Sequence, residues 1–220
     1  MKKFAEDFKP DFVVHLGDAL DLAYFSIFDA ENVQVQAKGN WEADVDLVNR
    51  ELDSWQKICP AFYLVQGNHD ERAERVSKEY PKFAASLDYA TRFHLKDRKI
   101  HYSRLVDPPL KLGKLHYIHG WYYNLYHSKK TVDEFSGNIV YGHCHGFQSY
   151  PKILTARAEE LMAWAIGCLC DKQPDYVKGR PTGWQHGFGI TYLRDKGNFN
   201  FYSINITGRG FCWEGREYTY

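Results

Sequence analysis

The sequence has no excess of charge of either sign, because 28 Lys and Arg residues balance 28 Asp and Glu residues. A neutral chain has no global field to attract nucleic acid or an anionic membrane, so any recognition of phosphate must be local. Long apolar runs are also missing: the longest, residues 161–170, is about half of the roughly 20 residues that a membrane helix needs. Residues 1–9 are too charged for a signal peptide. We therefore expect a soluble protein that does not bind a membrane.

Cysteine is scarce and scattered. The five cysteines include no C-x-x-C pair, which argues against a disulfide framework and favours reduced thiols in the cytoplasm. Cys168 and Cys170 are two residues apart and would point the same way from a strand. Two such thiols could in principle bind a metal, but no further Cys or His follows at a zinc spacing. We interpret them as buried small apolar groups.

The chain is long enough for one medium domain, with 220 residues of which 44% are hydrophobic and 25% are charged. Short β-branched and aromatic runs alternate with segments of helical periodicity, as in α/β proteins. Beyond residue 183, apolar and polar residues alternate and glycines are frequent, which predicts antiparallel strands and hairpins. The predicted helices cover residues 1–8, 42–58 and 70–85, and the predicted strands cover residues 12–16, 61–66, 115–119 and 138–141.

Each predicted strand stops at polar residues. In open α/β sheets ligands bind outside the carboxyl ends of the strands, so these side chains are candidate site residues. Taken singly, each is more often structural than functional. Together they offer a carboxylate, an amide oxygen and several imidazoles, a donor set suited to Mn, Fe, Zn or Ni, whereas a thiolate cluster would indicate structural zinc. The candidates are Asp18, Asn68, His69, His119, His143 and His145.

Four sequence blocks carry a resemblance to a known family. Residues 16–21 (LGDALD), 67–72 (GNHDER), 119–120 (HG) and 142–145 (GHCH) resemble, in order and spacing, four of the five blocks of the calcineurin-like metallophosphoesterases. The resemblance runs from the N-terminus to about residue 150. The later stretches 163–170 and 184–189 are similar to small phosphoesterases of phages and bacteria.

The resemblance implies a single domain over residues 1–220. Its fold would be an α/β sandwich of two mixed sheets flanked by helices, with the C-terminal third completing the second sheet. The implied activity is hydrolysis of phosphomonoester or phosphodiester bonds. The resemblance leaves open whether the substrate is a nucleotide, a nucleic acid or a phosphoprotein.

The resemblance also assigns roles to the candidate residues. Asp18 would bridge two divalent ions, with manganese expected and iron, zinc or nickel as alternatives. His69, held by Asp70, would lie just outside the ligand shell and protonate the leaving oxygen or stabilise charge on the phosphoryl group. Two cations that clamp a phosphate also make a water acidic enough to attack in line. Asn68, His119 and His143 would complete one metal, and His145 would bind the other.

The chain departs from the family pattern at the first block, an Asp-x-His at the end of an initial strand. Asp11 precedes the predicted strand 12–16 and His15 lies within it, so neither occupies the position that this block needs. We expect that the first strand is missing and that the native gene encodes about 20 to 30 more residues, the usual length of a strand and turn in a βαβ unit. The alternative is a naturally degenerate one-metal relative that binds phosphate or nucleic acid without turnover.

Several residues keep two interpretations. Asp21 either caps the next segment or orients the site, with the structural role favoured. Arg72 either meets a substrate phosphate or pairs with a neighbouring glutamate. Trp184 and His186 either line a substrate pocket or have only a structural role in packing. Nucleic acid is one candidate substrate, since basic residues and aromatic residues suited to base stacking are interleaved near the C-terminus. They are Arg180, Arg194, Lys196, Arg209 and Arg216, with Trp184, Tyr192, Phe199 and Phe201.

Overall fold

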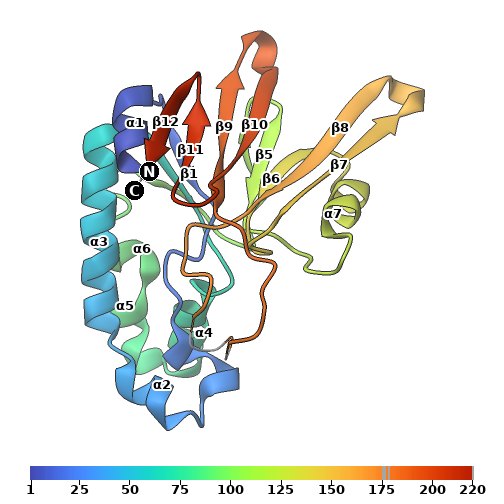
Figure 1. Cartoon of the computed structure of the whole chain (residues 1–220). Helices are drawn as coiled ribbons and strands as arrows, with labels where there is room; N and C mark the ends of the chain where they lie inside the picture. Colours follow the sequence, from blue (N-terminus) through green and yellow to red (C-terminus); the bar gives the residue numbers. More distant parts are fainter. Residues whose placement is uncertain (175–176, 178, 220) are drawn as a thin grey trace. The chain divides into compact units, whose positions relative to one another are not determined.

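The computed structural model describes residues 1–174, 177 and 179–219. The chain divides into two compact units, residues 1–108 and 109–220, and each is described by itself. Figure 1 shows the elements along the chain. No helix in the described residues is both long and apolar enough to cross a membrane.

The helices of the first unit are α1 (Lys2–Phe8), α2 (Val33–Lys38), α3 (Trp41–Ile58), α4 (Glu71–Glu79), α5 (Ala84–Leu87) and α6 (Tyr89–Arg92), with short 3-10 helices at Ala23–Phe25, Ile27–Asp29 and Pro81–Phe83. Its strands are β1 (Val13–His15), β2 (Phe62–Val65) and β3 (His101–Ser103). The second unit has α7 (His127–Phe135) and 3-10 helices at Thr155–Arg157 and Asp195–Gly197. Its strands are β4 (Leu110–Leu112), β5 (Leu115–Ile118), β6 (Asn138–Tyr141), β7 (Phe147–Leu154), β8 (Glu159–Ile166), β9 (Gly187–Leu193), β10 (Phe199–Asn205), β11 (Gly210–Trp213) and β12 (Arg216–Thr219).

The first unit is built on a parallel sheet in the order β1-β2-β3. Helix α3 begins at Asn40, whose side-chain oxygen accepts a hydrogen bond from the Ala43 backbone N–H at 3.1 Å. Its apolar face packs into the same buried cluster as Phe62 and Leu64 of β2, and α1 lies along α3 (Figure 1). The predicted helix over residues 42–58 and the two predicted strands of this unit are confirmed.

The predicted helix over residues 70–85 is interrupted. Helix α4 ends at Glu79, a 3-10 turn follows, and α5 begins at Ala84. The cause is Pro81, because a proline ring disfavours the helical conformation of the residue before it. Tyr80 accordingly has φ −123° and ψ 76°.

The second unit is built on a mixed sheet in the order β4-β5-β6-β8-β7. Strands β5, β6 and β8 are parallel, and the edge strands β4 and β7 run antiparallel to their neighbours. Helix α7 packs on β7 and β8 and buries Val132 with the apolar side chains of the sheet. The predicted strands over residues 115–119 and 138–141 are confirmed, and so is the mixed α/β class with helices flanking the sheets. The long β7–β8 hairpin was not predicted.

The C-terminal strands pair as predicted but do not complete the second sheet. Strand β9 pairs with β10 and β11 with β12, each as an antiparallel two-stranded sheet. Backbone hydrogen bonds join the β9–β10 hairpin to the larger sheet only at its ends, from Gly187 N–H to the Cys168 carbonyl oxygen at 3.0 Å and from Lys114 N–H to the Gly197 carbonyl oxygen at 2.8 Å. Between these points side chains make the contact. The ring of Trp164 on β8 lies 5.9 Å from that of Phe199 and 5.0 Å from that of Phe201. The hairpin therefore packs against β8 instead of extending the ladder.

Candidate metal and catalytic residues

Asp18 lies in the loop that follows β1, next to the loop that follows β2. Because β1 and β2 are parallel neighbours, their carboxyl ends meet at one edge of the sheet. Asp18 has a left-handed backbone (φ 52°), which Asp adopts more readily than most residues. A Cβ atom on Gly67 would lie 2.0 Å from Asp18 Oδ1. The glycine of the 67–72 block is therefore required for the two loops to approach this closely, and Asn68 follows it in the same turn.

Asp70 ties the two loops together. Its fully buried carboxylate accepts hydrogen bonds from the backbone N–H groups of Asp18 and Gly67, both at 2.8 Å, and from that of Leu20 at 3.3 Å. The Tyr89 hydroxyl donates a fourth, at 3.1 Å. Burial, and after it the charge of Asp70, raises the pKa of Tyr89, so the phenol keeps its proton and donates it. Asp70 thus fixes the position of Asp18 through the backbone.

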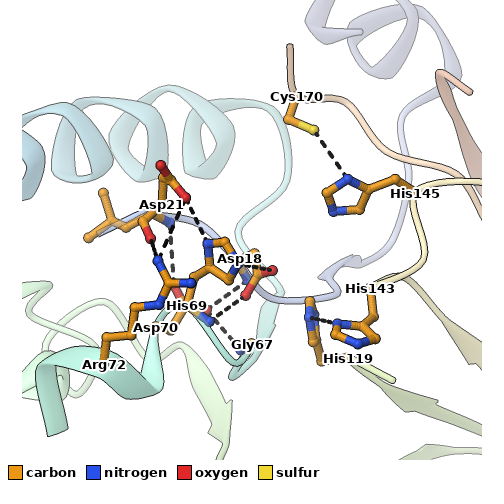
Figure 2. A network of polar contacts seen from close by, with 11 residues as sticks. Asp18, Asp21, Gly67, His69, Asp70, Arg72, His119, His143, His145 and Cys170 are labelled. Carbon is orange, nitrogen blue, oxygen red and sulfur yellow. Dashed lines mark hydrogen bonds and ion pairs between the residues drawn. The ribbon is translucent and has the colours of Figure 1, made fainter. Parts of the chain in front are cut away.

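His69 is oriented by Asp21 rather than by Asp70, which corrects the expectation from the sequence. His69 Nδ1 lies 2.8 Å from Asp21 Oδ1, and its backbone N–H donates to Asp18 Oδ1 at 2.9 Å (Figure 2). With Nδ1–H directed to Asp21, the other ring nitrogen, Nε2, lies 4.0 Å from Asp18 Oδ2. The reason is geometric: the Asp70 carboxylate is directed at backbone amides and Tyr89. The sequence contained the signal, since Asp21 follows Asp18 by three residues.

Arg72 reaches the same loop from the start of α4. Its Nη1 donates to the Asp21 carbonyl oxygen at 2.7 Å and lies 3.9 Å from the Asp21 carboxylate. Burial lowers the pKa of Arg72, while the charges of Asp21 and Asp18 act in the opposite direction. The guanidinium therefore stays cationic beside two carboxylates, and its partner is Asp21 rather than a glutamate of its own helix. Asp21 contacts both His69 and Arg72, which supports its role in orienting the site. The helix that follows has Leu22 as its N-cap and no side-chain cap, so the favoured capping role is not seen.

His119 and His143 lie together in the second unit. They follow β5 and β6, which are parallel neighbours. His119 is buried, and its Nε2 lies 3.1 Å from His143 Nδ1 (Figure 2). Two nitrogens bound at about 2.1 Å to one ion lie about 3.0 to 3.4 Å apart at octahedral or tetrahedral angles. The pair therefore fits two ligands of a single metal.

The backbone forces this pair together. His143 has a left-handed backbone (φ 61°). Gly120, after His119, has φ 142°, and a Cβ atom there would lie 2.6 Å from His143 Cβ. The Gly142 N–H donates to the His119 carbonyl oxygen at 2.9 Å, which locks the two strand ends. The glycines of the 119–120 and 142–145 blocks thus allow the two imidazole rings to lie close together.

His145 has different neighbours from the His119 and His143 pair. Its ring centroid is 4.0 Å from that of Trp184, at an interplanar angle of 74°, and its Nδ1 is 4.0 Å from Cys170 Sγ (Figure 2). Cys170 is exposed and Cys168 half-buried, so the interpretation of both as buried apolar groups is wrong. The chain turns at Gly167 after β8 instead of continuing as a strand. A hydrogen bond from the Cys170 thiol lowers the pKa of Cys168 and raises that of Cys170.

The structure therefore assembles two groups from the predicted residues. Asp18, His69 and Asp70 come together in the first unit, and His119 and His143 in the second. Of the aromatic residues considered for base stacking, Phe199 and Phe201 pack on Trp164. The residues that sequence reasoning undervalued are Asp21, Cys168 and Cys170.

Comparison with protein families decides the class. The model of the calcineurin-like phosphoesterases matches residues 1–165. The chain belongs to this family. Its members are metal-dependent phosphoester hydrolases, so the chain is a phosphoesterase, and the oxygen and nitrogen donors of both groups fit divalent metals. Comparisons with curated proteins and with solved structures gave no match. The family match ends before Cys168 and Cys170.

Proposed function

We propose that this phosphoesterase hydrolyses phosphomonoester or phosphodiester bonds with two divalent ions, of which manganese is the first candidate. The observation that carries the proposal is the 3.1 Å separation of His119 Nε2 and His143 Nδ1 at the ends of two adjacent parallel strands. Side chains on rigid strand ends hold an ion with little reorganisation. The proposed ligands are Asp18 as the bridge, Asn68, His119, His143 and His145.

When bound, the ions would supply Lewis-acid polarisation of the phosphate and would lower the pKa of a water molecule. The chain's own residues position the reacting groups. Asp18 is fixed by the Asp70 hydrogen bond to its backbone and by the His69 N–H on its Oδ1. His69 acts as the proton donor to the leaving oxygen: Asp21 holds the proton on Nδ1, which leaves Nε2 to carry the transferred proton. Asp70 is a positioning residue.

The experiment compares hydrolysis of p-nitrophenyl phosphate, bis(p-nitrophenyl) phosphate and a single-stranded oligonucleotide by the full chain with Mn²⁺. His143→Asn removes a proposed ligand while keeping a residue that tolerates the left-handed backbone. We expect a loss of more than about 100-fold, because even outer-shell partners of a metal are worth roughly 10- to 100-fold. The matched control is His94→Asn, an exposed histidine with φ 52°. Equal activity of the two variants would contradict the assignment of His143.

Asp18→Asn tests the bridge in the same way, with Asp46→Asn on the exposed face of α3 as its control. Asn keeps an oxygen that can accept the His69 N–H, so the loop geometry is retained. We expect the first variant to lose activity and to bind fewer Mn²⁺ ions per chain, measured by equilibrium dialysis. An unchanged metal content would rule out Asp18 as a bridge.

The same dialysis distinguishes the alternative of a one-metal relative that binds without turnover. Two ions per chain together with turnover support the enzyme, whereas one ion and binding of inorganic phosphate without turnover support the binding module. We also propose a cytoplasmic location, which the five free thiols support. Cleavage of the oligonucleotide would extend the proposal to nuclease activity.

A further inference from the structure

We propose that His145, Cys168 and Cys170 form a binding site for a thiophilic divalent cation, Zn²⁺ first among them. One ring nitrogen of His145 and the two Sγ atoms all lie within 4.8 Å of one another. Cys170 Sγ is 4.0 Å from His145 Nδ1 (Figure 2). The three groups come from different parts of the sequence, because His145 follows β6 and the thiols follow β8. This is why the spacing of the cysteines alone gave no zinc pattern.

One short segment holds all three ligands. The Gln185 N–H donates to the His145 carbonyl oxygen at 2.7 Å, and the Gln185 carbonyl oxygen accepts from the Cys168 N–H at 2.9 Å. His186 Nε2 donates to the Cys170 carbonyl oxygen at 2.8 Å. The backbone of Gln185 and the side chain of His186 therefore fix the histidine loop and the cysteine turn against each other.

Two further features preorganise the cluster. Gly167 has φ 72°, and a Cβ atom there would lie 2.4 Å from the Gln185 carbonyl oxygen, so the turn that directs both thiols to one side needs glycine. The indole of Trp184 packs against the His145 ring and limits its rotation. Cys170 is exposed, which gives an ion access from solvent.

Binding a tetrahedral ion requires the three groups to move closer together, by at most about 1 Å for pairs at the 4.8 Å limit. Zinc lies about 2.3 Å from a cysteine sulfur and about 2.0 to 2.1 Å from a histidine nitrogen, so two ligands lie about 3.6 to 3.8 Å apart. The observed 4.0 Å between Cys170 Sγ and His145 Nδ1 needs a contraction of a few tenths of an ångström, within the reach of a side-chain rotation. Two thiolates and one imidazole select zinc over Mn²⁺ and Mg²⁺, which prefer oxygen ligands. Three protein ligands leave a fourth position open.

This site is separable from the proposed phosphoesterase centre. His145 contributes Nδ1 here, so Nε2 is the nitrogen left for the proposed catalytic centre, and binding both ions at once would require the ring to lose its remaining N–H proton. The cysteines lie beyond residue 165, where the family match ends. Both proposals use His145, so they are distinguished by variants that touch only one of them. Cys168→Ser with Cys170→Ser changes only the sulfur ligands, and Asp18→Asn changes only the proposed catalytic centre.

The test is a titration of the reduced full chain with Co²⁺, which takes the tetrahedral zinc position and gives a near-ultraviolet charge-transfer band only when thiolate sulfur is bound. We expect one equivalent of Co²⁺ to produce the band and Zn²⁺ to abolish it. The double variant Cys168→Ser with Cys170→Ser should lose the band. The matched control Cys212→Ser, which removes another exposed thiol, should keep it. Asp18→Asn should keep it as well, because that variant disrupts only the proposed catalytic centre.

Three results would overturn the proposal: no band in the wild-type protein, a band that survives in the double serine variant, or a Cys168–Cys170 disulfide in protein purified under reductant. Circular dichroism of the double variant checks that its fold is intact. His145→Gln provides a second variant that keeps both thiols. We expect its affinity for Co²⁺ to fall at least about tenfold, since it removes one of three ligands and even outer-shell partners are worth that much. An unchanged affinity would remove His145 from the site.

Discussion

Substitution of Asp70 by Asn tests whether this carboxylate organises the first unit. The change is nearly isosteric, so it creates no cavity and removes only charge and acceptor capacity. The carboxylate accepts from four donors, and two of them, the Asp18 and Gly67 N–H groups, share Oδ2 at 2.8 Å. An Asn side chain keeps those two by placing its oxygen there, which turns its NH₂ group toward Leu20 and Tyr89.

The cost follows from that arrangement. The Tyr89 hydroxyl can rotate and accept from the new NH₂ group, but the buried Leu20 N–H then faces another donor. An unsatisfied buried N–H costs about 1 to 3 kcal/mol, and each of the two retained hydrogen bonds loses roughly 1 kcal/mol without the charge. We expect Asp70→Asn to lower the free energy of unfolding by about 3 to 5 kcal/mol.

Equilibrium urea unfolding of the full chain measures this difference, with amide hydrogen exchange at Asp18 and Gly67 to locate it. Tyr89→Phe is the control, because it removes only one of the four donors and should cost about 1.5 to 3 kcal/mol. Exchange at Asp18 and Gly67 should accelerate in Asp70→Asn. A cost below about 1 kcal/mol, or below that of Tyr89→Phe, would refute the role of Asp70 as the organiser of the two loops.

Three further predictions concern other residues. Gly67→Ala should reduce Mn²⁺ affinity at least about tenfold, because its Cβ would lie 2.0 Å from Asp18 Oδ1. Changes outside the ligand shell of a metal already reduce affinity by about that factor. Equilibrium dialysis measures the affinity. His69→Gln should lower kcat about 100-fold with little change in KM, whereas a change in KM alone would contradict a proton-donor role. Burial lowers the pKa of His127, so the unfolded chain binds a proton more readily than the folded chain. The unfolding free energy should therefore fall as the pH decreases below about 6.5, and His127→Gln should flatten that slope in urea titrations at pH 5 and 7.5.

The sequence alone predicted the class of the fold and the residues at the strand ends. Apolar runs such as 12–16 and 138–141 are short and bounded by polar or glycine residues, so their period and length identify buried strands. The candidate site residues at the ends of these strands could also be predicted from local sequence, because the blocks 67–72 and 142–145 each place several of them in one short segment. The family match over residues 1–165 confirms the class that these blocks indicated.

Only the tertiary structure decided which partner each polar group has. Asp70 is next to His69 in sequence, yet its carboxylate is directed at the amides of Asp18 and Gly67, while Asp21 reaches the His69 ring. No periodicity encodes this choice, because it depends on how two separate loops meet.

The cluster of His145, Cys168 and Cys170 also depends on how separate loops meet. His145 and Cys170 are 25 residues apart, and a hairpin of two long strands separates them. Residues 185 and 186 bring them together through hydrogen bonds between loops. Side-chain contacts between distant segments depend on the packing of whole strands, which a local pattern of residue types does not contain. The sequence therefore determined what chemistry the chain carries, and the tertiary structure decided which groups act together.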